Sequence, residues 1–214
     1  MQLRVCGLTA RLTLRVSKMF LKLFAICFIG LAMVAANGAR AANPVVVIET
    51  SLGKVKVELY EDKAPITVKN FLAYTEDKFY DGTIFHRVMG KENSGRDFMI
   101  QGGGHTPDLK EKDNKKKSIK NESANGLSNA RGTIAMARTG DPDSATCQFY
   151  INVADNTGLD KANDDAGHGY CVFGRVTEGM DIVDKIKAVP TVKRGGQGNL
   201  PKEDIVIKSV RLDK

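Results

Sequence analysis

Hydrophobic and polar residues alternate near the start of the predicted folded domain. In Lys54–Leu59 every second residue is hydrophobic, with lysine or glutamate between, and the hydrophobic run Val45–Glu49 precedes it across the turn Thr50–Gly53. Hydrophobic residues with a period of two lie on one face of a β-strand. The segment therefore predicts a β-hairpin with one buried face.

A longer period predicts two helices. Pro65 begins the segment Pro65–Lys78, in which hydrophobic residues recur at spacings of three and four and share one face. Proline is favourable at the first position of a helix, and this spacing is typical of an amphipathic one. Met180–Val189 has the same spacing and is the second predicted helix.

Six further segments are typical of short strands. They are Ile84–Val88, Phe98–Gln101, Thr133–Ala137, Phe149–Val153, Cys171–Val176 and Ile205–Leu212. With the hairpin they make eight strands, and only two separated helices accompany them. We therefore predict a mainly β fold, a closed eight-stranded antiparallel β-barrel whose ends are capped by the two α-helices.

Residues 1–41 have the pattern of a secretory signal peptide. Basic residues precede the uninterrupted hydrophobic and small-residue run Leu23–Ala36, and Ala39-Arg40-Ala41 follows it. This order is typical of a cleaved leader, and the run is shorter than the roughly 20 residues of a membrane-spanning helix. We expect cleavage near Ala41-Ala42, with Met19 as a plausible true start, no stable membrane insertion and a mature domain of residues 42–214.

Removal of this leader changes the charge of the protein. The whole chain has 32 basic and 25 acidic residues, a formal net charge of +7, but residues 1–41 contain six basic residues and no acidic one. The remaining domain has a net charge of +1, so we expect no nucleic-acid partner. Its basic segment Lys110–Lys120 is interspersed with acidic residues, and we interpret it as a solvated loop.

Residues 42–214 are enough for one domain with a hydrophobic core, and no repeat or linker divides them. Two cysteines remain after cleavage, Cys147 and Cys171. An oxidising compartment permits them to pair as a disulfide, and the alternative is two partly buried free thiols on strands. The sequence leaves both open.

Two segments contain the side chains with candidate chemistry. Ile84–Gly104 contains Arg87, then a hydrophobic pair and Gln101 ahead of three glycines, and Gln148–Asn152 adds a second amide among aromatic residues. A cation, two neutral amides and apolar side chains do not suit hydrolysis or redox chemistry. They suit the binding and twisting of an uncharged peptide, in particular at an X-Pro bond.

The chain resembles the cyclophilin-type peptidyl-prolyl cis-trans isomerases. The resemblance rests on five segments in order, FHRV, FMIQGG, GTIAMAR, QFYINV and YCVFGRVTEGMDIVDKI, and extends over Asn43–Asp213. With the leader, it is similar to the bacterial periplasmic branch. It implies a cyclophilin-like barrel and an isomerase that needs no cofactor. We expect a periplasmic monomer that acts on unfolded or partly folded polypeptides with X-Pro bonds and assists the folding of exported proteins.

The same resemblance implies roles for ten residues. Arg87 and Gln101 would be catalytic. The substrate-binding residues would be Phe98, Met99, Ala137, Arg138, Gln148, Tyr150, Leu159 and Tyr170. The chemistry supports Arg87, because the prolyl nitrogen gains a lone pair when the bond twists. A guanidinium at that nitrogen stabilises the twisted state more than either planar isomer.

Three features depart from the family pattern. Val88–Asp97 is longer than the usual connection after Arg87, and we expect a bulging loop, with displacement of the arginine or cover over the site as alternatives. Gly158 stands where an aromatic residue is common, so we expect weak cyclosporin binding; submicromolar inhibition would contradict this. Arg138 and Cys147 stand where small or polar neutral residues are usual. Our hypothesis is that Arg138 biases the site toward acidic residues near the target proline.

Two other classes of function stay open. The protein is a non-catalytic peptide-binding module or chaperone if the longer connection has disabled Arg87. It is a thiol enzyme if Cys147 is a nucleophile, and alkylation would then inactivate it. The glycines after Gln101 lack the spacing of a phosphate-binding loop, and the three histidines lack the spacing of a zinc site. We therefore expect no metal.

Overall fold

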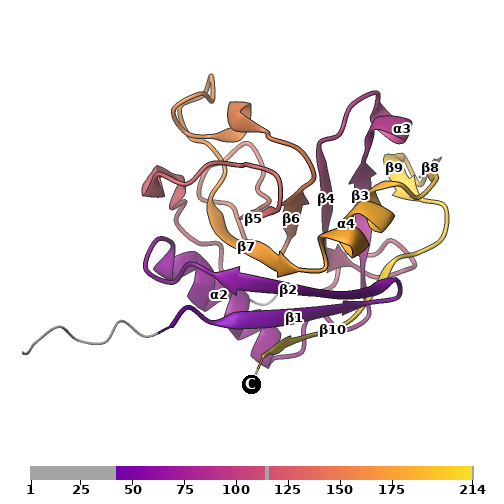
Figure 1. The fold of residues 1–214 in the computed structure, drawn as a ribbon, viewed down its shortest axis with the longest axis horizontal. Coiled ribbons are helices and arrows are strands. Elements are labelled where there is room, and N and C mark those ends of the chain that lie inside the picture. The colour runs from indigo at the N-terminus through magenta and orange to yellow at the C-terminus, as the bar shows by residue number, and fades with distance from the viewer. Residues whose placement is uncertain (1–41, 114–115, 214) are drawn as a thin grey trace, which may run out of the picture. The chain divides into compact units, whose positions relative to one another are not determined.

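Eight antiparallel strands form a closed barrel in the part of the chain that the computed structural model describes, residues 42–113 and 116–213. Along the chain they are β1 (Val45–Thr50), β2 (Gly53–Leu59), β3 (Thr83–Met89), β4 (Met99–His105), β5 (Thr133–Met136), β6 (Phe149–Asn152), β7 (Val172–Glu178) and β10 (Val206–Leu212). Around the barrel the order is β1-β10-β3-β4-β6-β5-β7-β2 (Figure 1). The predicted barrel is confirmed. The predicted leader, residues 1–41, lies outside the described residues.

The described part contains three α-helices rather than the two predicted. The predicted pair are α2 (Pro65–Glu76) and α4 (Met180–Lys187), each slightly shorter than expected. The third, α3 (Lys91–Ser94), is a single turn in the long connection between β3 and β4. The sequence pattern also missed the hairpin of β8 (Thr191–Arg194) and β9 (Gln197–Pro201), which lies beside β3 and α3 in Figure 1. None of the described helices has the length and hydrophobicity that a membrane crossing requires.

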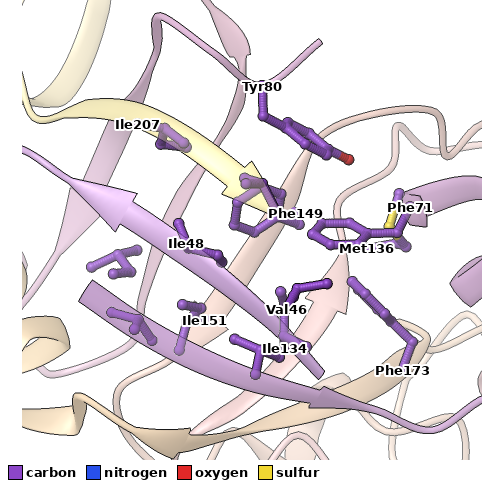
Figure 2. Packing of buried hydrophobic residues seen from close by; sticks show 14 of the residues in the cluster. Val46, Ile48, Phe71, Tyr80, Ile134, Met136, Phe149, Ile151, Phe173 and Ile207 are labelled. Atoms are coloured by element: carbon purple, nitrogen blue, oxygen red, sulfur yellow. The ribbon is translucent and has the colours of Figure 1, made fainter. Parts of the chain in front are cut away.

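Side chains from α2, from α4 and from the inner face of the barrel form one core. Figure 2 shows part of it, with Phe71 of α2 among strand residues. Phe71 of α2 lies at its centre, with ring centroids 5.6 Å from Phe149 and 5.3 Å from Phe173. Val183 and Ile186 of α4 belong to the same cluster. Aromatic pairs at these separations each stabilise a core by about 0.5–1.5 kcal/mol beyond the area they bury. The barrel interior is thus filled, and any peptide must bind on its outside.

The first turn of α2 is capped by a residue distant in sequence. The preceding Ala64 provides no side-chain cap. Instead the carboxylate of Glu122 accepts hydrogen bonds from the backbone N–H of Ile66 at 3.1 Å and of Thr67 at 2.8 Å, and from the Thr67 hydroxyl at 2.7 Å. A negative charge at this end also complements the helix dipole. Glu122 therefore joins the loop before β5 to α2.

Two histidine rings lie together beside the sheet. The ring centroids of His86 on β3 and His105 on β4 are 4.3 Å apart, and both Nδ1 atoms are buried without a hydrogen-bond partner among the described residues. Burial, with a smaller contribution from His105, lowers the pKa of His86 to about 4. His86 is therefore neutral in the folded protein at mildly acidic pH.

This pair predicts a loss of stability in mild acid. An unfolded histidine binds a proton near its ordinary pKa of about 6.5, whereas folded His86 does so only near pH 4. The unfolded state therefore binds more protons between these values. The free energy of unfolding should fall by about 2 kcal/mol as the pH drops from 6.5 to 4.5. Urea titrations at several pH values measure this, and a His86→Phe variant should lack most of the slope. An equal slope in that variant would assign the effect to other groups.

Candidate active site

The candidate site is built on the outer face of four neighbouring strands. The register pairs Arg87 of β3 with Gln101 of β4, Gln101 with Tyr150 of β6, and Tyr150 with Ala135 of β5. Residues at paired positions lie on the same face of a sheet. Their chain neighbours Ile100, Phe149 and Ile134 belong instead to the core inside the barrel.

Loops cover part of this outer face, which explains why β6 is buried on both sides. Met99, Ala135, Tyr150 and Val172 form a second small hydrophobic cluster, separate from the main core. Side chains from the covering loops pack against it, among them Leu127, Leu159 and Tyr170. The strands thus supply the floor of a site, and the loops supply its walls.

A pocket of about 160 Å³ opens on this face. Its lining consists of nine of the ten residues predicted from the sequence, namely Arg87, Phe98, Met99, Gln101, Ala137, Arg138, Tyr150, Leu159 and Tyr170. The tenth, Gln148, does not line the pocket, but its side chain accepts a hydrogen bond from Gln101, which does. Most of the lining is apolar, and its charged members are two arginines without a carboxylate.

A chain of polar side chains ends at Arg87. Gln101 Nε2 donates a hydrogen bond to Gln148 Oε1 at 2.9 Å, and Arg87 Nη1 lies 3.5 Å from Gln101 Oε1. This contact is long, and Arg87 is exposed and makes no ion pair within the described residues. Gln148 thereby fixes the orientation of the Gln101 amide, and the guanidinium keeps free N–H donors.

Gly104 makes room for this arrangement. A Cβ atom at position 104 would lie 2.4 Å from Cγ and 2.7 Å from Cδ of Gln148. We expect Gly104→Ala to rotate Gln148 away from Gln101 and to lower kcat/KM for an X-Pro peptide about three- to tenfold, the equivalent of about one lost hydrogen bond. The melting temperature should change little, because a side chain can move aside more easily than backbone.

Gly158 offers the matched control for this substitution. It lies next to the pocket residue Leu159, and a Cβ atom there would meet nothing within 4 Å. Gly158→Ala should leave both kcat/KM and melting temperature unchanged. Equal activity of the two alanine variants would contradict the role assigned to the Gln148–Gln101 hydrogen bond.

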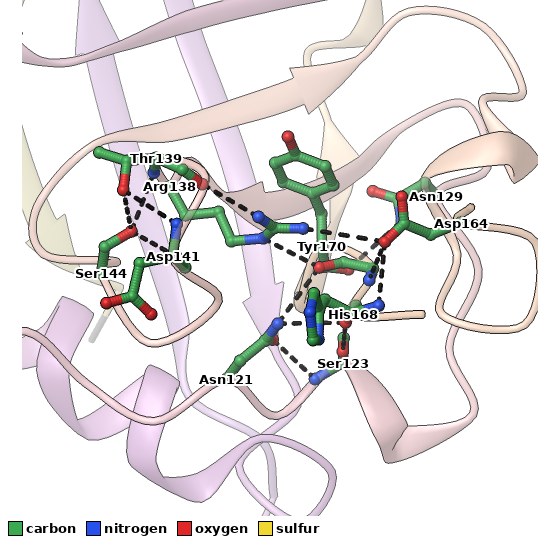
Figure 3. A network of polar contacts seen from close by, with 11 residues as sticks. Asn121, Ser123, Asn129, Arg138, Thr139, Asp141, Ser144, Asp164, His168 and Tyr170 are labelled. Carbon is green, nitrogen blue, oxygen red and sulfur yellow. Dashed lines mark hydrogen bonds and ion pairs between the residues drawn. The ribbon is translucent and has the colours of Figure 1, made fainter. Parts of the chain in front are cut away.

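Arg138 forms one wall of the pocket, and its guanidinium is already engaged in contacts with neighbouring groups of the protein (Figure 3). Its guanidinium carbon lies 4.2 Å from the centroid of the Tyr170 ring, Nε donates to Gly169 O at 3.1 Å, and Nη1 donates to Thr139 O at 3.0 Å. Only 8% of the side chain is exposed, and Asp164 lies 4.0 Å from Nη2. The backbone N–H groups of Gly169 and His168 hold the pKa of Asp164 below its ordinary value. Arg138 therefore orients Tyr170 and its loop.

Asn129 is a site residue that the sequence did not reveal. It is fully buried. Its Oδ1 accepts a hydrogen bond from the Tyr150 hydroxyl at 2.8 Å, while its backbone N–H and side-chain Nδ2 donate to Asp160 at 2.7 and 2.9 Å. Nδ2 also lies 3.3 Å from Tyr170 O. One amide thus joins the floor of the pocket to the loop that forms its walls. A lone asparagine in a polar loop gives no signal of this role.

The long connection after Arg87 does not displace the arginine. Residues 90–97 form a bulge that contains α3, and β3 and β4 keep the Arg87–Gln101 register. The bulge is tied to the end of α4, because Asn93 Nδ2 donates to Val189 O at 3.1 Å and Lys187 Nζ contacts Asp97 at 2.9 Å. This ammonium holds the pKa of Asp97 below its ordinary value. Of the outcomes weighed from the sequence, the bulging loop is the one observed.

The two described cysteines are free and buried. Burial raises the pKa of the Cys171 thiol to about 11 and also raises that of Cys147. A nucleophilic cysteine needs the opposite shift. Within residues 42–113 and 116–213, no group of three or more histidine, cysteine, aspartate or glutamate side chains is arranged to hold a metal ion.

Comparison with known proteins identifies the family. The family described as cyclophilin type peptidyl-prolyl cis-trans isomerase/CLD matches residues 45–212. A peptidyl-prolyl cis-trans isomerase of Acinetobacter baylyi is 53% identical over 171 residues, which are 80% of this chain and 86% of that protein. Peptidyl-prolyl cis-trans isomerase B of Escherichia coli is 51% identical over 170 residues, 79% of this chain and 99% of that protein.

A solved structure agrees with this assignment. The cyclophilin type peptidyl-prolyl cis-trans isomerase of Cryptosporidium parvum, crystallised in the presence of the dipeptide Ala-Pro, matches with a TM-score of 0.63 and 25% identity. The match covers 79% of this chain and 99% of that chain. With the barrel, the pocket and the sequence relatives in agreement, the chain belongs to the cyclophilin-type peptidyl-prolyl cis-trans isomerases.

Proposed function

We propose that the protein accelerates X-Pro isomerisation in unfolded or partly folded exported polypeptides, with Arg87 as the residue that stabilises the twisted bond. The observation that carries the catalytic part is the exposed guanidinium of Arg87, which forms no ion pair with the described residues, at the edge of an apolar pocket and beside an amide that is itself held in place. A proline ring fits the apolar floor, and the peptide bond before it then lies within reach of Arg87.

The reaction requires only that the enzyme stabilise the twisted peptide bond more than it stabilises either planar isomer. Resonance gives the peptide bond a rotational barrier of about 18–20 kcal/mol, and uncatalysed X-Pro exchange takes tens to hundreds of seconds. When the bond twists, resonance is lost and the prolyl nitrogen gains a lone pair. A donor N–H of Arg87 binds that lone pair, which neither planar isomer offers, and so lowers the barrier.

The remaining pocket residues hold the substrate. Gln101 binds the substrate backbone, and its hydrogen bond to Gln148 limits the directions in which its amide can point. The N–H of Ala137 already donates to Gln148 O at 3.0 Å, so Ala137 contributes its carbonyl to the bound peptide. Phe98, Met99 and Leu159 exclude water, which strengthens the charge-assisted bond that Arg87 makes. Their apolar surface suits a proline ring.

The setting of this activity is part of the proposal. The leader pattern of residues 1–41 favours export, and a periplasmic monomer would meet its substrates as they emerge unfolded. Prolines of such chains have not yet settled into one isomer. Weak cyclosporin binding stays a prediction, and Gly158, with open space around it, is the position at which an aromatic residue should strengthen it.

The rival functions differ in what they require of this site. A peptide-binding module would bind X-Pro peptides in the pocket without accelerating their exchange. A thiol enzyme would need an accessible thiolate, and the raised pKa values of Cys147 and Cys171 argue against one.

The test is the refolding of a substrate protein whose slow phase is limited by proline isomerisation. The purified protein should accelerate that phase catalytically, at concentrations well below that of the substrate. An unchanged slow phase, together with measurable binding of a proline peptide, would favour the binding module. Activity that disappears on thiol alkylation would favour the thiol enzyme.

A further inference from the structure

We infer that Arg96, on the bulge between β3 and β4, makes this isomerase prefer substrates with an acidic side chain next to the target proline. The inference deepens the proposed function and rests on it. The guanidinium carbon of Arg96 lies 5.1 Å from the centroid of the Phe98 ring, and Phe98 lines the pocket. The cation thus stands at the pocket rim, on the face of an aromatic side chain.

The backbone of Arg96 is fixed on both sides. Before it, Gly95 ends α3 with φ 79° and donates its N–H to Lys91 O at 2.9 Å. After it, Asp97 accepts hydrogen bonds from Lys91 N at 2.8 Å and Lys187 Nζ at 2.9 Å. The carbonyl of Arg96 itself accepts the Ser94 hydroxyl at 2.9 Å. A charge on a fixed backbone loses less conformational freedom when it binds a partner.

The Arg96 charge is available for a substrate. Its side chain is exposed, and no carboxylate of the described residues pairs with it. Nearby Asp97 is held by Lys187, and at the other wall Arg138 is occupied by Gly169, Thr139 and Tyr170. Arg87, the other exposed arginine of the site, is assigned to the twisted peptide bond. Arg96, rather than Arg138, is therefore the cation that can meet an acidic side chain beside the proline.

The pocket itself favours the same substrates. Its lining has two arginines, Arg87 and Arg138, and no carboxylate. With Arg96 at the rim, a peptide that places proline in the pocket brings its neighbouring side chains into a positive field. A glutamate there gains attraction, and a lysine meets repulsion.

The experiment compares three short peptides that differ only in having glutamate, glutamine or lysine beside the proline. Separate series place the variable residue before the proline, directly after it and two residues after it. Isomerisation is measured without a coupling protease at low ionic strength. An exposed ion pair predicts that kcat/KM is about two- to fivefold higher for glutamate than for glutamine at one or more positions. Salt at about 0.5 M should reduce this preference.

Variants assign the preference to one residue. Arg96→Ala should remove it and Arg96→Glu should invert it, while the glutamine peptide keeps its rate within about twofold, as expected for an exposed position. Lys208→Glu is the matched control, since it makes the same charge change at an exposed residue of β10, a strand that contributes nothing to the pocket lining. It should leave the preference intact.

The outcomes separate this inference from the function on which it rests. If the wild-type protein isomerises none of the peptides, the proposed function fails. If it isomerises all three equally at every position, or if its preference survives in Arg96→Ala, only the role of Arg96 is overturned. A preference that Arg96→Ala abolishes and Lys208→Glu retains supports it.

Discussion

Replacement of Arg87 by alanine should lower kcat/KM for X-Pro isomerisation by about two to three orders of magnitude, the usual cost of removing one donor that acts on the transition state. The fold should be unaffected, because Arg87 is exposed and its one side-chain hydrogen bond within the described residues, to Gln101, is long at 3.5 Å. Peptide binding should also persist, since the apolar lining is unchanged. A protease-free peptide assay measures the loss of activity, and a thermal melt of the same preparation measures the stability of the fold.

Two further variants sharpen this test. Arg87→Lys keeps the charge but not the planar fork of donors, so it should recover part of the lost activity at most. Arg175→Ala removes another exposed arginine, one that pairs with Glu58 on the far side of β7, and should retain full activity. If Arg87→Ala retains activity within about threefold, a range usual for a surface substitution, Arg87 is not the catalytic residue.

Replacement of Asn129 by alanine should destabilise the protein by about 4 kcal/mol, a drop of roughly 10 °C in melting temperature for a domain of this size. The side chain is fully buried and bonds to Tyr150, Asp160, Asn152 and Tyr170. Its loss leaves the buried hydroxyl of Tyr150 without its partner and removes one hydrogen bond from the carboxylate of Asp160. Each such group lowers the free energy of unfolding by about 1–3 kcal/mol.

The same substitution should also impair the site. Tyr150 and Tyr170 line the pocket, so their loosened positions should raise KM more than they lower kcat. Ser128→Ala is the matched control, because Ser128 bonds to the same Asp160 at 2.6 Å but is exposed. It should cost less than about 1 kcal/mol, as exposed hydrogen bonds do. An equal loss of stability in the two variants would mean that the buried hydrogen bonds of Asn129 stabilise the protein no more than an exposed one does.

Alternation of hydrophobic residues predicted the hairpin of β1 and β2, because these strands are buried on one face. The barrel was predicted from the number of short strand-like segments and the two separated helices. The end of β4 was predicted wrongly. We expected it at Gln101, yet the strand continues to His105. A Cβ atom at Gly102 would lie 3.0 Å from Ile84 O, and one at Gly103 2.8 Å from the Phe149 ring. These glycines permit close packing, which a local pattern cannot reveal.

The resemblance to a family located the pocket residues. The contacts that hold these residues in place became visible only in the structure. Arg87 and Gln101 are adjacent because of strand register, which depends on the whole barrel. The cap that Glu122 gives α2 and the contacts of Asn129 join segments far apart in sequence. No spacing rule indicates such partners. The hairpin β8–β9 escaped prediction because β8 has no buried residue and β9 buries only its last two, so that no alternating hydrophobic face marks either strand.

The closed ring of strands has a consequence for the proposed function, in which the substrates are unfolded chains. Every strand of the barrel has a hydrogen-bonded neighbour on both sides. Aggregation and strand addition both begin at unpaired sheet edges, where backbone N–H and C=O groups await a partner. The barrel has no such edge to which an exposed hydrophobic segment of a substrate could add as a strand. Under the proposed function, the barrel therefore does not join an unfolded substrate in a growing sheet, and the substrate can dissociate once its X-Pro bond has isomerised.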